Sequence, residues 1–226
     1  MMQAFQQFIG INTAMYYGPD ILKSCGIKFP NMDDDSSALL LNIPLASINA
    51  LGTLISVFTI DKLGRRYILL RTLPFVILGW VTVAIGMGVA GNPDNKTTGG
   101  YISVAGLMLF LFTFSIGVSS TPWTINAEIY PIHVIGTASS LSTTTNWATN
   151  AIVASVFLLT TSTVTGQVLT YSLLAFFGLL CLVFVYKFVP ETANKQINEI
   201  LTDILGPSYK QIDDRSESYR QTTADE

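Results

Sequence analysis

The sequence predicts an all-helical integral membrane protein, and composition and the length of its apolar runs support that prediction. Half of the 226 residues are hydrophobic, only 12% are charged, and the mean hydropathy is +0.47. An average globular domain carries about twice that share of charge. Apolar runs recur along the chain at the length, roughly 20 residues, that an α-helix needs to cross a bilayer. Short polar joints separate them.

Six such runs are present. They lie near residues 2–22, 38–60, 67–90, 101–125, 136–160 and 166–189. We therefore expect a six-helix transmembrane unit over residues 1–200. Residues 201–226 contain few apolar side chains, so we expect a disordered cytoplasmic tail there.

The distribution of basic residues predicts the orientation. Basic residues favour the cytoplasmic side of a membrane, and one short joint holds a strong cluster, made of Lys62, Arg65, Arg66 and Arg71. Alternation then puts both chain termini in the cytoplasm and residues 91–100 outside. Asn95 in this outer loop begins an Asn-Lys-Thr glycosylation sequon, which agrees with that side. We expect a multi-pass protein of the plasma membrane or of an endomembrane such as the vacuole.

Several function classes are excluded. The net charge of -3 comes without a basic patch, so nucleic acid is not a partner. Cys25 and Cys181 have no partners at ligand spacing, which argues against a disulfide framework or a metal site. No nucleophile, metal cluster or paired carboxylate lies at membrane depth, so we expect neither an enzyme nor a cofactor. The same depth contains no ionisable residue that could carry a proton. We assign no role to His133.

Amides cluster in the first run. A polar group in hydrocarbon without a partner costs several kcal/mol, so these side chains should face another helix or a wet cavity. At about 100° per residue Gln6 and Gly10 share one helical face, whereas Asn12 projects elsewhere. Glycine tolerates a break in a helix. Unwinding at Gly10 would bring Asn12 back toward Gln6 and Gln7.

The fourth run repeats this pattern. It contains Pro122, which removes a backbone donor and kinks helices. Runs 1–3 and runs 4–6 then have the same order of helix types: an interrupted helix, an amide-bearing helix and a plain apolar helix. Interrupted helices at corresponding positions of two repeats point to the substrate site of a transporter. Neutral amides and the ring of Trp123 suit a neutral polyhydroxylated ligand.

Alternative interpretations exist for these residues. Gln6, Gln7 and Asn49 could simply bond neighbouring helices, although the repeat favours a substrate site. For the aromatic residues Tyr16, Tyr17 and Trp147, packing or interface anchoring is favoured over a binding role. Three acids lie at cytoplasmic helix ends: Asp61, Glu128 and Glu191. Two interpretations are equally favoured for them, namely solvated surface charges and an ionic latch with Arg65 or Arg66.

At this point the motifs resemble those of the sugar porter family, in the major facilitator superfamily. They are QQFIGINTAMYY (6–17), DKLGRR (61–66), PWTINAEIYP (122–131), NWATN (146–150) and PETANKQINEI (190–200). The order resembles the C-terminal half of such a transporter, with two inverted three-helix repeats. Within the family, the longer strings are most similar to proton-coupled myo-inositol transporters.

The resemblance implies a role for each matched residue. Substrate contact falls to Gln6, Gln7, Asn12, Asn49 and Trp123, with Asn146 and Asn150 close by. Tyr16 and Tyr17 correspond to an extracellular gate. The charged residues of a cytoplasmic latch are Asp61, Arg65, Arg66, Glu128 and Glu191. The implied mechanism is alternating access, and the implied partner is an N-terminal six-helix half, from the same gene or a separate chain.

The chain departs from the family pattern at four places. Ser115 stands where facilitative glucose carriers have a glutamate, and GVSSTPW replaces GPxPxPW, which predicts a less broken outer half for that helix. Ile135 replaces an arginine, and PETAN replaces PETKG. We expect proton-coupled transport of a neutral sugar or cyclic polyol, with myo-inositol as substrate. The alternatives are a truncated, non-transporting protein, such as a sugar sensor or assembly partner, and a carrier made of two copies.

Overall fold

The computed structural model describes residues 1–16, 18, 21, 23, 33–131 and 134–206, and every regular element among them is helical. The long helices are α4 (Asp34–Leu63), α5 (Arg65–Ala90), α6 (Lys96–Ile116), α8 (Ile135–Thr160) and α9 (Val164–Phe188). The short ones are α1 (Met2–Phe8), α2 (Ile11–Tyr16), α7 (Thr121–Glu128) and α10 (Ile197–Leu205), with the 3₁₀ turn η1 (Pro93–Asn95).

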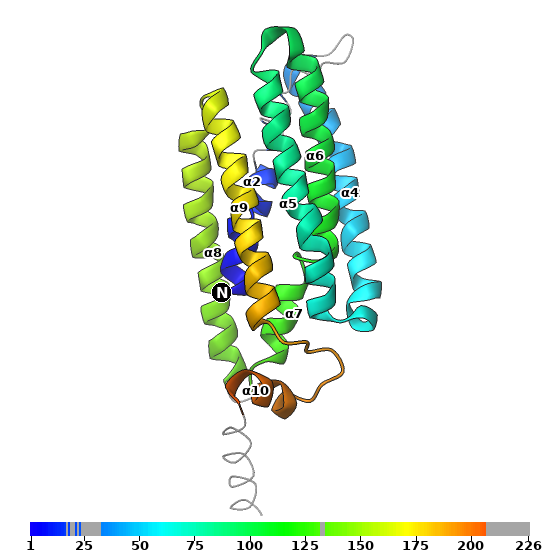
Figure 1. The fold of residues 1–226 in the computed structure, drawn as a ribbon, viewed down its shortest axis with the longest axis vertical. Helices are drawn as coiled ribbons and strands as arrows, with labels where there is room; N and C mark the ends of the chain where they lie inside the picture. Colours follow the sequence, from blue (N-terminus) through cyan, green and yellow to red (C-terminus); the bar gives the residue numbers. More distant parts are fainter. Residues whose placement is uncertain (17, 19–20, 22, 24–32, 132–133, 207–226) are drawn as a thin grey trace, which may run out of the picture.

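The five long helices run along the long axis of the molecule (Figure 1). Helix α5 packs against both α6 and α9. Its Trp80 is fully buried, with ring centroids 4.3 Å from Phe110 of α6 and 5.5 Å from Tyr171 of α9. Glycine allows the close approach of α5 and α6, since a Cβ on Gly79 would lie 2.8 Å from the backbone of Phe110. These contacts make α5 the centre of the core.

Among the described residues, four stretches are by themselves long and apolar enough to cross a membrane: Asp35–Leu63, Arg65–Ala90, Pro93–Glu128 and Val164–Phe188. Helix α8 is as long, but its first half is rich in hydroxyl and amide side chains. The first predicted run is divided into α1 and α2, each too short to span. Helix α8 and the pair α1 and α2 are the more polar helices of the bundle, and they contact one another. They carry most of the predicted substrate residues.

Helix α10 corrects the expected domain boundary. A disordered tail was expected from residue 201, yet the helix continues to Leu205. A capping box stabilises its start, where Gln196 and Glu199 exchange side-chain to backbone hydrogen bonds. Ile200 and Leu201 are buried, so one apolar face of the helix is fixed against the bundle. In Figure 1 the helix lies across one end of the molecule, below α9.

Candidate functional site

The first interruption lies where the sequence predicts it. Gly10 separates α1 from α2 and has φ +88°, a backbone conformation that glycine adopts without a Cβ penalty. The side chain of Leu174 also leaves no room for a Cβ there. The carbonyl of Ile9 accepts a hydrogen bond of 2.7 Å from the indole nitrogen of Trp80. A side chain of α5 therefore satisfies a backbone group that the break leaves without a helical partner.

The second interruption corrects the role predicted for Pro122. The helix breaks over residues 117–120, between α6 and α7, and Pro122 occupies the first turn of α7. Proline fits a first turn because its missing N–H has no partner there. The outer part, α6, is unbroken, in line with the loss of prolines from GPxPxPW. The carbonyls of Val118 and Ser119 both accept from Nε2 of Gln6, at 2.9 and 2.7 Å.

A buried amide cluster joins the two interrupted segments to α8. Nδ2 of Asn146 donates to Oε1 of Gln6 at 2.9 Å and to Oε1 of Gln3 at 2.8 Å. Its Oδ1 accepts from Nε2 of Gln7 at 2.9 Å. Beyond the break, Nδ2 of Asn12 donates to Oε1 of Gln7 at 3.0 Å. The unwinding at Gly10 thus returns Asn12 to the glutamines, as the sequence predicts.

A second set of polar contacts brings α4 into the site. Oγ of Ser115 donates to Oδ1 of Asn49 at 2.6 Å. Nδ2 of Asn49 lies 3.6 Å from Sδ of Met15, on α2. The hydroxyls of Ser56 and Ser120 are 2.7 Å apart, which connects α4 to the second interruption. Oγ of Ser115 also lies 2.6 Å from the carbonyl of Leu111, so its single proton serves one of these two acceptors.

The amides differ in the hydrogen bonds that they still have free. A primary amide offers two donors and two acceptor lone pairs. Gln6 uses both donors on the second break, and Asn146 uses its donors on Gln3 and Gln6. Gln7, Asn12 and Asn49 each use one of two donors within the described part of the chain. The latter three can still donate to a ligand, whereas Gln6 cannot without losing a contact.

The other predicted site residues lie around this cluster. Trp123 is on α7 and 40% exposed. Asn150 is buried one turn after Asn146 on α8 and makes no hydrogen bond among the described residues. Tyr16 ends α2 and is 53% exposed, while Tyr17 lies outside the described residues, as do Cys25 and His133. The indole of Trp123 is thus available on an open surface.

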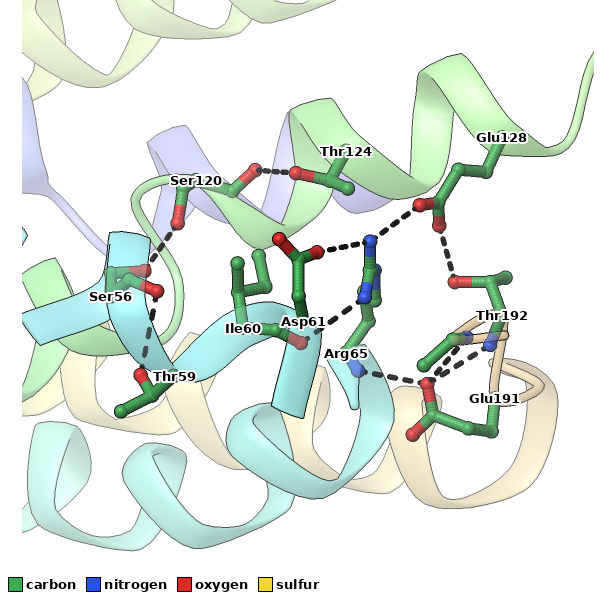
Figure 2. A network of polar contacts seen from close by, with 11 residues as sticks. Ser56, Thr59, Ile60, Asp61, Arg65, Ser120, Thr124, Glu128, Glu191 and Thr192 are labelled. Carbon is green, nitrogen blue, oxygen red and sulfur yellow. Dashed lines mark hydrogen bonds and ion pairs between the residues drawn. The ribbon is translucent and has the colours of Figure 1, made fainter. Parts of the chain in front are cut away.

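The predicted latch residues meet at the end of the bundle that carries α10 (Figure 2). Nη2 of Arg65 lies 2.8 Å from Oδ1 of Asp61 and 2.7 Å from Oε1 of Glu128. Glu128 also accepts from Oγ1 of Thr192 at 2.6 Å. Arg66 makes no ion pair among the described residues, and its Nη2 donates to the carbonyl of Tyr186. Arg65 is therefore the cation of the latch.

Glu191 acts on the backbone and not on a guanidinium. Its carboxylate accepts from the backbone N–H groups of Arg65 and Arg66, at 2.8 and 3.1 Å. These groups open α5, where a negative charge complements the helix dipole. Gly64 has φ +92°, and a Cβ there would lie 2.6 Å from Oε2 of Glu191. Asn194, at the glycine position of PETKG, has φ +58°. Asparagine tolerates this conformation, so the departure keeps the backbone of the motif.

Two polar residues of this site were missed by the sequence analysis. Trp80 lies in an otherwise apolar run, and Gln3 precedes the quoted motif. The signal for Trp80 was present, since a buried indole N–H normally needs an acceptor. Asn95 is exposed at the end of η1, and the connection from α5 to α6 lies at the opposite end of the molecule from α10 (Figure 1). Ile135, where the family has arginine, begins α8 and is half-buried.

Comparison with known proteins supports the motif assignment. The family model described as sugar (and other) transporter matches residues 1–203. The chain is 35% identical to membrane transporter D1 of Leishmania donovani over 199 residues, covering 88% of this chain and 35% of that protein. It is 27% identical to probable inositol transporter 2 of Arabidopsis thaliana, covering 88% of this chain and 47% of that protein.

The fold also matches a solved transporter. The proton:xylose symporter XylE, bound to 6-bromo-6-deoxy-D-glucose, aligns with a TM-score of 0.69 and 27% identity, over 90% of this chain and 41% of that one. The chain thus spans between a third and a half of the length of these relatives. They are transporters and not enzymes. The chain belongs to the sugar porter family of the major facilitator superfamily and covers one half of its fold.

Proposed function

We propose that the chain forms one half of a proton-coupled carrier for a neutral sugar or cyclic polyol, with myo-inositol as the substrate. The observation that carries this proposal is the buried amide cluster at the two helix interruptions, from which Gln7, Asn12 and Asn49 keep donors for a ligand. Substrate sites of transporters lie at such interruptions. Relatives named for inositol and for xylose fit a polyhydroxylated substrate.

Each residue has a separate part in this proposal. Gln7, Asn12 and Asn49 bond the hydroxyls, and the exposed ring of Trp123 stacks on the apolar face of the ring. Asn150 is a further amide on the same helix as Asn146. Gln6 and Asn146 hold the two interrupted segments in place. Tyr16 and Tyr17 close the outer side of the site.

The latch gives the proposed alternating-access cycle its inner closure. Arg65, Asp61 and Glu128 are paired, and Arg65 is buried. Pairs that hold a closed state must separate when the inner side opens. No ionisable side chain of the described residues belongs to the amide cluster, so the proton carrier of the proposed symport lies in the other six-helix half.

Uptake of labelled myo-inositol tests this proposal. The chain is expressed with its complementary half in cells that lack inositol uptake, at several external pH values. Gln7→Ala and Asn49→Ala should each reduce uptake about 2- to 13-fold at substrate concentrations below saturation, since each removes a hydrogen bond to the substrate worth about 0.5–1.5 kcal/mol. Gln167→Ala is the matched control, because among the described residues that amide bonds only the carbonyl of Thr161, just after the end of α8.

Three outcomes would contradict parts of the proposal. Uptake that is unchanged in both site variants would reject the residue assignment. Uptake that ignores external pH and protonophores would reject proton coupling. Normal surface expression without uptake of any sugar or polyol would favour the alternative of a non-transporting sensor or assembly partner.

A further inference from the structure

A basic cavity lies away from the amide cluster, at the latch end of the bundle. It has a volume of about 480 Å³, within the range of small-molecule pockets. Its charged lining residues are Arg66, Lys187 and Asp203. Apolar walls come from the end of α9, the segment that follows it and α10; they are Phe188, Val189, Pro190 and Ile204. None of the residues proposed to bind sugar lines it.

Two cations of this cavity have no carboxylate partner in the described part of the chain. Arg66 bonds only the carbonyl of Tyr186, at 2.6 Å, and its buried Nε has no partner. Lys187 makes no hydrogen bond or ion pair among the described residues. Asp203 is already paired with Lys195, at 2.6 Å. The cavity therefore offers guanidinium and ammonium donors to an anion.

The nearest other acid does not neutralise Arg66 through its side chain. Glu191 directs its carboxylate at the backbone N–H groups of Arg65, Arg66 and Tyr67. The negative charge of Glu191 is therefore directed at the first backbone N–H groups of α5. The side-chain charge of Arg66 is thus not neutralised by Glu191.

The position of the cavity identifies the source of the anion. Lys187 stands in the last turn of the membrane-spanning helix α9. Exposed aromatic residues surround it, with Tyr186 67% and Phe188 68% exposed. Tyrosine side chains are enriched at the headgroup level of a bilayer because they are amphipathic. Basic pockets between membrane helices at this level bind anionic lipid headgroups.

We propose that this cavity binds the phosphate group of an anionic membrane phospholipid, with Arg66 and Lys187 as its ligands. The guanidinium of Arg66 can bond phosphate oxygens in a planar, bidentate manner. The acyl chains would follow the exposed apolar surface of α9. The site lies beside the latch, since Arg66 and Arg65 share the carboxylate of Glu191.

Lipid binding to the purified, complete transporter tests the proposal. A fluorescent phosphatidylglycerol is titrated against wild-type protein and R66Q/K187Q protein in phosphatidylcholine nanodiscs. The control is K62Q/R71Q, which removes the same charge at the same end but outside the cavity. Each basic residue near a membrane surface contributes about 1 kcal/mol. The cavity variant should therefore bind about 30-fold more weakly, and the control should stay within about fivefold of wild type.

Three outcomes would overturn the proposal. Equal affinity of wild-type and R66Q/K187Q protein overturns the proposal, as does equal weakening in both double variants, which indicates a diffuse basic rim. Inorganic phosphate that displaces the lipid at concentrations as low as those at which the lipid itself binds also overturns it, in favour of a soluble anion. If R66Q/K187Q protein melts early in phosphatidylcholine alone, the single variant K187Q is used, because Lys187 is exposed. It should bind about fivefold more weakly.

Discussion

Gln6 and Gln7 are adjacent, carry the same side chain and belong to one motif, yet the structure predicts different consequences of changing them to leucine. Gln6→Leu removes both donors to the second break, so the carbonyls of Val118 and Ser119 lose their side-chain partner. A buried polar group left unsatisfied costs about 1–3 kcal/mol. Gln6→Leu should therefore destabilise the protein by about 2–6 kcal/mol.

Gln7→Leu disturbs less of the fold. It removes one donor from a buried acceptor, since Oδ1 of Asn146 accepts from Nε2 of Gln7, whereas Asn12 is half-buried and can bond water. One buried acceptor left unsatisfied costs about 1–3 kcal/mol, half of the cost expected for Gln6→Leu. The proposed ligand bond of Gln7 is lost, which corresponds to about 0.5–1.5 kcal/mol of binding free energy. The Kd for the substrate should thus rise about 2- to 13-fold, with about half of the loss of stability expected for Gln6→Leu.

Thermal unfolding and ligand binding of the purified variants separate these effects. For a chain of this size about 1 kcal/mol shifts the Tm by 2–4 °C, so Gln6→Leu should lower the Tm by at least about 4 °C. Gln167→Leu, which removes an amide outside the site, is the matched control. An unchanged Tm for Gln6→Leu, together with a loss of affinity equal to that of Gln7→Leu, would refute the reasoning and identify Gln6 as a ligand.

Three further predictions concern the backbone and the orientation. Trp80→Phe keeps an aromatic ring in the core but removes the donor to Ile9, so the protein should lose about 1–3 kcal/mol of unfolding free energy, and a Tm equal to wild type would contradict it. Gly64→Ala forces alanine to φ +92° against Glu191; it should cost at least about 1–2 kcal/mol in thermal unfolding, whereas Gly136→Ala, with open space around it, should not. Asn95→Gln should abolish an endoglycosidase-sensitive shift in gel mobility if the loop faces outward, and a wild-type protein without that shift would count against the predicted orientation.

The sequence determined the class of protein and the positions of its irregularities. Apolar composition and run length predict membrane helices because a bilayer offers no water to an unpaired backbone. Gly10 predicts the first break because glycine alone enters that backbone region at little cost. For Asp61 the sequence left solvated charge and an ionic latch equally open, and the structure shows its ion pair with Arg65 across the break at Gly64.

Tertiary structure decided what each polar group does. Gln6 meets Val118 across 112 positions of sequence, Gln7 meets Asn146 across 139, and Trp80 meets Ile9 across 71. Residue type says that an amide or indole in hydrocarbon needs a partner, but it does not say which one. The partner of each group depends on how the helices pack and on which amide then lies within hydrogen-bond distance of a broken segment. Gln6 and Gln7 are identical neighbours in the sequence, so the difference between their hydrogen-bond partners follows from the fold alone.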